Sequence, residues 1–157
     1  MASAIRNDLK FIVNEIYEKT NTAYSLMLGA NESSKMVLSL DGDLMVNTRD
    51  LLLFANSKSP ILGICTPSTD DPVLCETADD NGKQFAQRFS RKNGEYEWSG
   101  LTTLPSIWLK NMAYRSHVYH SLEPHLPIQA LHIDCAEVDT PEDLTRAEAW
   151  WSNGDKT

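Results

Sequence analysis

Short apolar runs alternate with polar turns along the chain, and four of these runs have the length and composition of buried strands. They are Lys10–Asn14, Met36–Leu40, Ile61–Cys65 and Ala130–Asp134. Other segments carry apolar residues at helical spacing or begin with residues that favour a helix start, so they predict helices. These are Thr22–Ala30, the stretch from Thr48 (the expected N-cap) to Ala55, the stretch from Pro105 to Met112, and the stretch from Thr140 to Trp151.

The middle of the chain has a different pattern, with turn residues between strand-like runs. Asn81-Gly82 separates Val73–Thr77 from Gln84–Phe89, which predicts a β-hairpin with a tight turn. A further strand is expected at Tyr96–Leu104. Strands and helices alternate on both sides of this hairpin-rich part. The pattern therefore predicts an α/β fold, with a mixed, mostly parallel sheet flanked by helices, in a single domain over residues 1–157.

Composition narrows the classes of partner. The net charge of −8 repels phosphate backbones, so we expect no nucleic-acid partner. No apolar stretch approaches the roughly 20 residues of a membrane span, so we expect no membrane partner either. The three cysteines are widely spaced and form no C-x-x-C, which argues against a zinc ribbon or a disulfide framework. Together with a start that lacks a signal peptide, this cysteine usage predicts a cytoplasmic location.

Acidic residues follow the second apolar run directly. Asp41 and Asp43 flank Gly42 at the carboxyl end of Met36–Leu40, the edge where open α/β sheets bind ligands. Carboxylate oxygens are ligands that Mg²⁺ prefers. The alternative is a turn in which Asp and Gly serve local geometry only. Asp139 precedes the helix start at Thr140, where it is either a second metal ligand or an acid that stabilises the helix dipole.

Other candidate sites are weaker. His117 and His120 are spaced to meet on one helical turn, but a zinc site needs three or four converging ligands, so surface histidines are the favoured interpretation. Ser25 and Ser99 lack the G-x-S-x-G setting of a serine nucleophile.

Two segments together resemble a known family. The strand that runs into "L-D-G-D" and the later "E-V-D-T-P-E-D-L" resemble the nucleoside-triphosphate transferases that act on sugar phosphates and phosphocholine. The middle segments "G-K-Q-F-A-Q-R-F-S-R-K" and "E-Y-E-W-S-G-L-T-T-L" resemble the strands on the substrate side of that family. The resemblance covers residues 8–152 and implies a Rossmann-like nucleotidyltransferase fold, with Mg²⁺ as cofactor and a nucleotide and a small phosphorylated compound as ligands.

The resemblance also implies roles for individual residues. Asp43 and Asp139 match the positions that bind Mg²⁺ and carry catalysis. Six further residues match the ligand side more loosely, and these are Asp41, Lys92, Glu97, Gly100, Asn21 and Ser25.

The chain departs from the family at its beginning. The family opens with a glycine-rich, basic loop that holds the triphosphate, and no such stretch precedes Phe11. We therefore expect a shortened nucleotidyltransferase that is inactive alone and active if complemented. The alternative is a non-catalytic protein that keeps the fold and binds a partner. In either case we expect an unpaired sheet edge and a homo-oligomer, such as a homodimer, that covers it.

Overall fold

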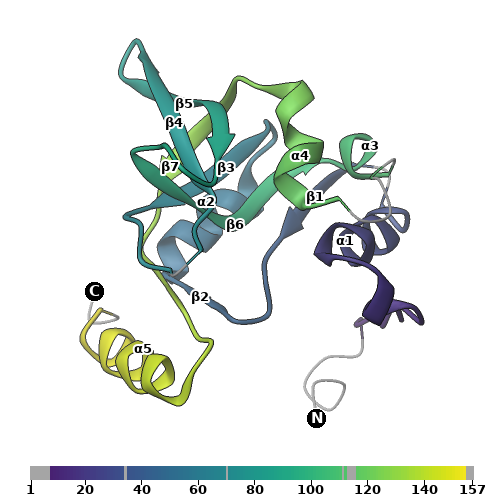
Figure 1. Ribbon diagram of the computed structural model, residues 1–157, viewed down its shortest axis with the longest axis horizontal. Helices are drawn as coiled ribbons and strands as arrows, with labels where there is room; N and C mark the ends of the chain where they lie inside the picture. The colour runs from purple at the N-terminus through teal and green to yellow at the C-terminus, as the bar shows by residue number, and fades with distance from the viewer. Residues whose placement is uncertain (1–7, 34, 70, 111, 113–115, 155–157) are drawn as a thin grey trace.

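The computed structural model describes residues 8–33, 35–69, 71–110, 112 and 116–154. A six-stranded sheet in the order β1-β6-β3-β7-β5-β4 lies at its centre (Figure 1). The strands of this sheet are β1 (Met36–Ser39), β3 (Ile61–Cys65), β4 (Leu74–Asp80), β5 (Lys83–Ser90), β6 (Tyr96–Pro105) and β7 (Ile128–His132). Two short strands, β2 (Leu44–Val46) and β8 (Cys135–Glu137), pair with each other as a separate ribbon.

The predicted mixed α/β class is confirmed, but the expectation of a mostly parallel sheet is wrong. Among the described strands, β3 and β7 form the parallel pair. The other pairings in the sheet are antiparallel. The physical reason is β6, which returns from the hairpin and runs antiparallel to β1, β3 and β4 at once.

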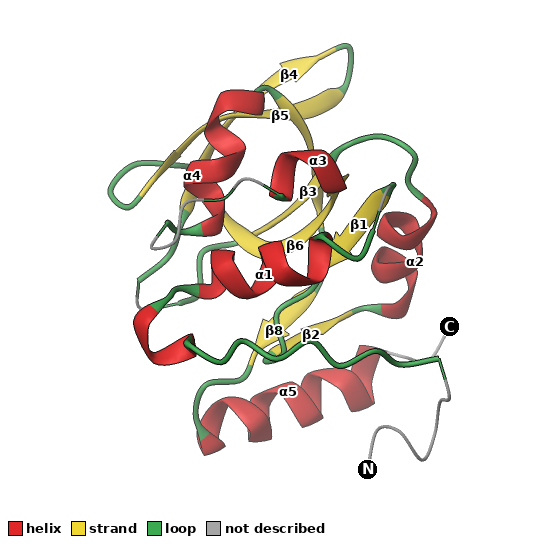
Figure 2. Cartoon of the chain, turned by 90° about the vertical axis from the view of Figure 1, so that its right-hand side faces the viewer, coloured by secondary structure: helices red, strands yellow, loops and turns green. Residues whose placement is uncertain are grey.

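Helices lie on both faces of the sheet. Figure 2 shows α1 (Thr22–Ala30), α3 (Ser106–Leu109) and α4 (Val118–Leu122) on one face, and α2 (Thr48–Asn56) on another side. Two apolar cores match this arrangement, because Leu104 of β6 packs in the core of α1, α3 and α4, whereas Leu101 packs with Phe54 of α2. The last helix, α5 (Pro141–Gly154), follows β8, and short 3₁₀ turns occupy Tyr17–Lys19 and Glu123–His125. No described helix has the length and apolar character needed to cross a bilayer.

Several predicted elements are found where local signals are strong. α1 and β3 have the predicted bounds. The hairpin turns at Asn81 and Gly82, whose φ angles of 55° and 78° are the left-handed values that such a turn requires. Two details differ. The cap of α2 is Asn47, which accepts a hydrogen bond from the Arg49 N–H at 2.9 Å, and the helix after Pro105 ends at Leu109.

The strand predicted at Lys10–Asn14 is absent. Phe11 and Val13 are 71% and 73% exposed, and this stretch pairs with no described strand. Asn14 instead organises a turn, since its side chain accepts from the Ile16 N–H at 3.1 Å and donates to Thr20 Oγ1 at 2.9 Å. An apolar run becomes a strand only when a neighbouring strand receives its backbone hydrogen bonds, and the described sheet provides none here.

Candidate acidic metal site and pocket

The backbone brings two distant acidic segments together. β1 ends in a turn in which the Leu44 N–H bonds the Asp41 carbonyl at 3.4 Å, and the chain continues as β2. β2 pairs antiparallel with β8, with Leu44 opposite Glu137, and the Val138 N–H donates to the Asp43 carbonyl at 2.9 Å. Residues 137 and 139 flank the residue that bonds to Asp43. The β2–β8 ribbon therefore places both next to Asp43.

Three carboxylates converge at this ribbon. Asp43, Glu137 and Asp139 are exposed, and one oxygen of each lies within 4.8 Å of the other two. The sequence predicted Asp43 and Asp139 as a pair, and the structure brings these two side chains together. It adds Glu137, which sequence reasoning did not single out. Its place in the cluster follows from the register of β2 against β8, which pairs Leu44 with Glu137 and which the sequence pattern does not report.

Like charges concentrate around Glu137. Partial burial raises the pKa of this carboxyl above its ordinary value, and the nearby Asp139 and Asp43 raise it further. Ionised together, the three groups repel one another unless a cation lies between them. Oxygen ligands that converge from three carboxylates suit a hard divalent cation such as Mg²⁺, so the residues present fit that ion.

The turn before β2 also serves local geometry. Residues 42 and 43 form a turn, so the turn predicted for this segment is present. Asp43 joins the acidic cluster, whereas Asp41 packs against Gly100 on β6. The metal role of this segment stays a prediction.

A pocket of about 380 Å³ opens beside the cluster. Its described lining combines carboxylates, small polar side chains, two thiols and one indole ring. These residues are Asp41, Leu44, Cys65, Ser68, Thr69, Asp71, Val73, Glu97, Trp98, Ser99, Gly100, Cys135, Glu137 and Asp139.

The predicted ligand-side residues divide into two groups. Asp41, Glu97 and Gly100 line the pocket. Ser25 lines a smaller neighbouring pocket of about 220 Å³, which also touches Asp41 and Gly100. Neither Asn21 nor Lys92 is among the described lining residues of either pocket. Asn21 is the residue before α1, and Lys92 lies in the turn between β5 and β6.

Gly100 allows Asp41 to approach β6 closely. Gly100 has a φ of 82°, and a Cβ added there would overlap Asp41 Oδ2 and lie 3.3 Å from Asp41 Cγ. This packing removes part of the Asp41 carboxyl from water, which raises its pKa, and the charge of Asp43 adds to the rise. The glycine therefore holds an acid with a perturbed pKa at the boundary between the two pockets.

Glu97 supports the opposite wall of the pocket. Glu97 is only 5% exposed, and its carboxylate accepts hydrogen bonds from the Ser68 N–H at 2.8 Å and the Thr69 N–H at 3.3 Å. The Thr69 hydroxyl donates to the second oxygen. The predicted substrate-side residue thus already holds the loop that carries Ser68 and Thr69 into the pocket lining.

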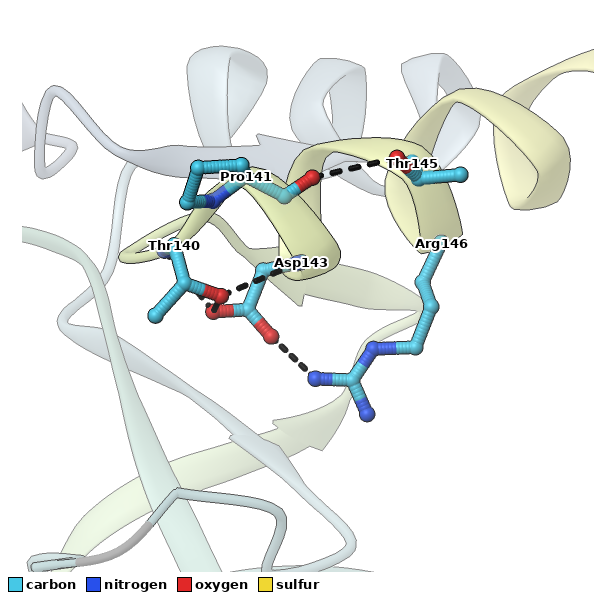
Figure 3. Close-up of polar contacts among 5 residues, drawn as sticks. All are labelled: Thr140, Pro141, Asp143, Thr145 and Arg146. Carbon is cyan, nitrogen blue, oxygen red and sulfur yellow. Dashed lines mark hydrogen bonds and ion pairs between the residues drawn. The ribbon is translucent and has the colours of Figure 1, made fainter.

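The start of α5 is stabilised by acids other than Asp139. Figure 3 shows Thr140 and Asp143 bonded reciprocally, with the Thr140 N–H and hydroxyl donating to Asp143 at 2.9 and 2.7 Å. Arg146 pairs with the same carboxylate. These hydrogen bonds and the charge of Arg146 lower the pKa of Asp143. Glu142 and Asp143 are the acids of the first helical turn, while Asp139 lies with the cluster.

The histidines join no comparable group. Within the described part of the chain, the acidic cluster is the set of three or more potential ligands close enough to share an ion. His117 and His120 stand edge to face, with ring centroids 5.6 Å apart, beside Tyr119. His117 and His120 are both exposed, as the surface interpretation predicts.

Known proteins resemble the chain in fold. No protein-family model and no curated protein matches its sequence. A putative glucose-1-phosphate thymidylyltransferase from Bacillus anthracis aligns with a TM-score of 0.68 and 14% identity, over 92% of this chain and 65% of that one. A UDP-glucose pyrophosphorylase complexed with UDP-glucose gives 0.66 and 10%, over 85% and 63%. The inositol-1-phosphate CTP transferase from T. maritima gives 0.65 and 17%, over 98% and 72%.

These neighbours are sugar-phosphate nucleotidyltransferases, and the chain has their fold. The fold implied by the sequence resemblance is confirmed. The chain spans less than two thirds of the length of the first two neighbours, so part of their structure has no counterpart in it.

Proposed function

We propose that this chain is the metal-binding and acceptor-binding part of a nucleotidyltransferase. The reaction transfers a nucleotidyl group from a nucleoside triphosphate to a sugar phosphate or to phosphocholine. The observation that carries the proposal is the convergence of Asp43, Glu137 and Asp139 at the rim of a pocket, in a fold shared with enzymes of this class. Asp43 and Asp139 are the proposed catalytic and metal-binding residues, and Glu137 is added to them.

The chemistry assigns a simple task to each part. An oxygen of the acceptor phosphate attacks the α-phosphorus of the triphosphate, the bond from that phosphorus to the bridging oxygen breaks, and pyrophosphate leaves. Mg²⁺ supplies neutralisation of the charge on the phosphate oxygens when it is bound. The three carboxylates would hold this ion at the rim of the pocket, and the pocket walls would orient the acceptor.

The triphosphate requires cationic donors from elsewhere. No Lys or Arg is among the described lining residues of the 380 Å³ pocket. A neighbouring pocket that also touches Glu137 and Asp139 includes Arg146, but this guanidinium is paired with Asp143. Nucleotidyl transfer depends on positioning and on neutralising phosphate charge. We therefore propose activity only when a phosphate-binding segment complements this chain, whether from the same polypeptide or from another.

The pocket lining favours a cationic acceptor head group within the proposed class. Asp41, Asp71 and Glu97 add negative charge to that of the cluster, and Trp98 adds an aromatic surface. Quaternary ammonium groups bind to aromatic rings and carboxylates. Phosphocholine is therefore the acceptor that we place ahead of a sugar phosphate.

Metal binding is the first test. Calorimetric titration of Mg²⁺ or Mn²⁺ should show one site in the wild-type protein and none in Asp43→Asn or Asp139→Asn. Asp80→Asn is the matched control, because Asp80 is an exposed acid at the distant hairpin. If Asp80→Asn weakens binding as much as Asp43→Asn does, binding is diffuse and the proposed site is wrong.

The reaction itself is the second test. The protein should be mixed with Mg²⁺, CTP or UTP, and either phosphocholine or glucose 1-phosphate, with and without a glycine-rich phosphate-binding segment supplied as a separate peptide or fusion. Pyrophosphate release that requires the segment and disappears in Asp43→Asn supports the function. Faster release with glucose 1-phosphate than with phosphocholine would contradict the preferred acceptor.

A second candidate function is a non-catalytic, oligomeric binding protein, and the edge of the sheet favours it. β1 pairs only with β6 among the described strands, so its other side carries unpaired backbone groups. Leu38 and Leu40 are also exposed there. We propose a homo-oligomer that covers this edge. Light scattering that gives the mass of a monomer at all concentrations contradicts the assembly.

A further inference from the structure

Two of the three cysteines meet at the pocket beside the acidic cluster. Cys65 ends β3 and Cys135 begins β8, and the Ile133 N–H donates to the Ile64 carbonyl at 3.0 Å, so the backbone brings the segments that carry the two cysteines side by side. The Cys65 thiol donates to the Glu97 carbonyl at 3.8 Å. Both sulfur-bearing residues line the pocket, and neither is fully buried. They are 70 residues apart in sequence, so the fold alone brings them together. The metal and acceptor chemistry proposed above uses neither thiol.

We propose that Cys65 and Cys135 form a reversible intramolecular disulfide, and that its formation weakens cation binding at Asp43, Glu137 and Asp139. The disulfide itself is independent of the proposed function, whereas its effect on the cation rests on that function. Cytoplasmic proteins keep their thiols reduced by default, and disulfides that form there are mostly regulatory. The proposed cytoplasmic location therefore fits a switch that is off until oxidation.

The neighbouring elements determine which strand moves. The two sulfurs must approach to about 2.05 Å to form the disulfide. β3 is buried between β6 and β7 and pairs with both, so Cys65 is held firmly. β8 has three residues and pairs only with β2 among the described strands, so Cys135 is the half of the pair that yields.

Movement of β8 reaches the cation site directly. Glu137 is the last residue of the same strand, two positions after Cys135, and Asp139 follows it. A shift of Cys135 toward β3 therefore strains the β2–β8 pairing and the bond from the Val138 N–H to the Asp43 carbonyl, which together place these two carboxylates beside Asp43. Displacing the supports of a metal ligand weakens binding by roughly 10- to 100-fold.

The proposed oxidant is a hydroperoxide, which accepts two electrons from the two thiols. One thiolate attacks the peroxide oxygen, the O–O bond breaks, and a sulfenic acid forms with loss of water or an alcohol. The second thiol attacks the sulfenic sulfur and expels water. Two electrons pass from the thiols to the peroxide. A dithiol reductant reverses the step by thiol–disulfide exchange.

Cys75 provides an internal control. It is fully buried in β4 and is not among the lining residues of the pocket. A thiol without access to solvent is oxidised slowly by peroxide. It should stay reduced under conditions that oxidise the pair.

The experiment treats the folded protein with stoichiometric hydrogen peroxide and follows it by intact mass, peptide mapping and Mn²⁺ calorimetry. We expect loss of two hydrogens, a peptide linked through Cys65 and Cys135, and a Kd for Mn²⁺ at least about tenfold weaker. Dithiothreitol should restore both mass and affinity. Cys75→Ser should behave like the wild type, whereas Cys65→Ser and Cys135→Ser should keep their affinity after oxidation.

Each contrary result has a separate meaning. Sulfinic acid or intermolecular dimers in place of the internal link would overturn the thiol pair. An internal link with unchanged Mn²⁺ affinity would overturn the coupling to the cluster. A reduced protein that binds no Mn²⁺ would refute the proposed metal site and leave the mapped disulfide standing as the result.

Discussion

Replacing Gly100 by alanine tests how the pocket holds Asp41. An alanine at a φ of 82° meets backbone strain of about 1–2 kcal/mol. The new Cβ would also overlap Asp41 Oδ2 and lie 3.3 Å from Asp41 Cγ. Because Asp41 is exposed, its carboxylate can rotate away from the new Cβ, so the overlap adds about 1 kcal/mol, the low end for overpacking. We therefore expect Gly100→Ala to lower the free energy of unfolding by about 2–3 kcal/mol.

The chain offers a matched control for the backbone term. Gly82 has a φ of 78°, and a Cβ added there meets nothing within 4 Å. Gly82→Ala should therefore carry the strain of about 1–2 kcal/mol alone. The difference between the two variants measures the contact with Asp41, free of the conformational preference of glycine.

A double variant completes the cycle. Alanine at position 41 keeps the Cβ, which would lie 4.0 Å from the new Cβ, an ordinary contact. Asp41→Ala should thus relieve the overlap, and the double variant with Gly100→Ala should show a coupling of about 1 kcal/mol. Urea denaturation measures all four proteins. Equal losses in Gly100→Ala and Gly82→Ala, with no coupling, would refute the close approach.

Three further predictions follow from the site. Because its carboxylate holds Ser68 and Thr69, Glu97→Gln should lower the free energy of unfolding by about 1–3 kcal/mol in urea titrations, whereas the exposed strand residue in Glu76→Gln should change little. The raised pKa of Glu137 means that the folded protein binds more protons than the unfolded chain above the ordinary value of 4.5. Metal-free stability should therefore fall as pH rises through the raised pKa. Scanning calorimetry should show that Glu137→Gln or added Mg²⁺ flattens this slope, and an unchanged slope would count against the cluster. Thr140→Ala should remove the cap of α5 and lower stability by about 1 kcal/mol, seen as a lower Tm, and an unaltered Tm would contradict the reciprocal bonding.

Local signals predicted the elements that local chemistry determines. Asn81-Gly82 supplied the left-handed residues of a hairpin turn, and Thr140-Pro141 supplied the cap and first position of a helix. In each case, a few residues adjacent in sequence are enough to determine the local backbone conformation. The run at Lys10–Asn14 had the composition of a strand but no partner in the described sheet, and composition does not report a partner.

Pairing between distant segments could not be predicted in the same way. The direction of β6 against β1, β3 and β4 depends on which strands meet after the hairpin, and the alternation along each strand is the same for either direction. The acidic pair of Asp43 and Asp139 was predicted through family resemblance. Glu137 was not, because its membership depends on the register of β2 against β8.

The cluster is easier to explain as a binding site than as a structural device. The start of α5 already has its cap and its first-turn acids, so Asp139 is not needed for helix stability. The β2–β8 ribbon has its backbone hydrogen bonds whatever side chains it carries. Partial burial raises the pKa of Glu137, and repulsion from the neighbouring carboxylates adds to the rise, in a protein with net charge −8. An arrangement that opposes folding at the rim of a pocket supports the proposed cation site, because a bound ion would restore the stability that its ligands remove.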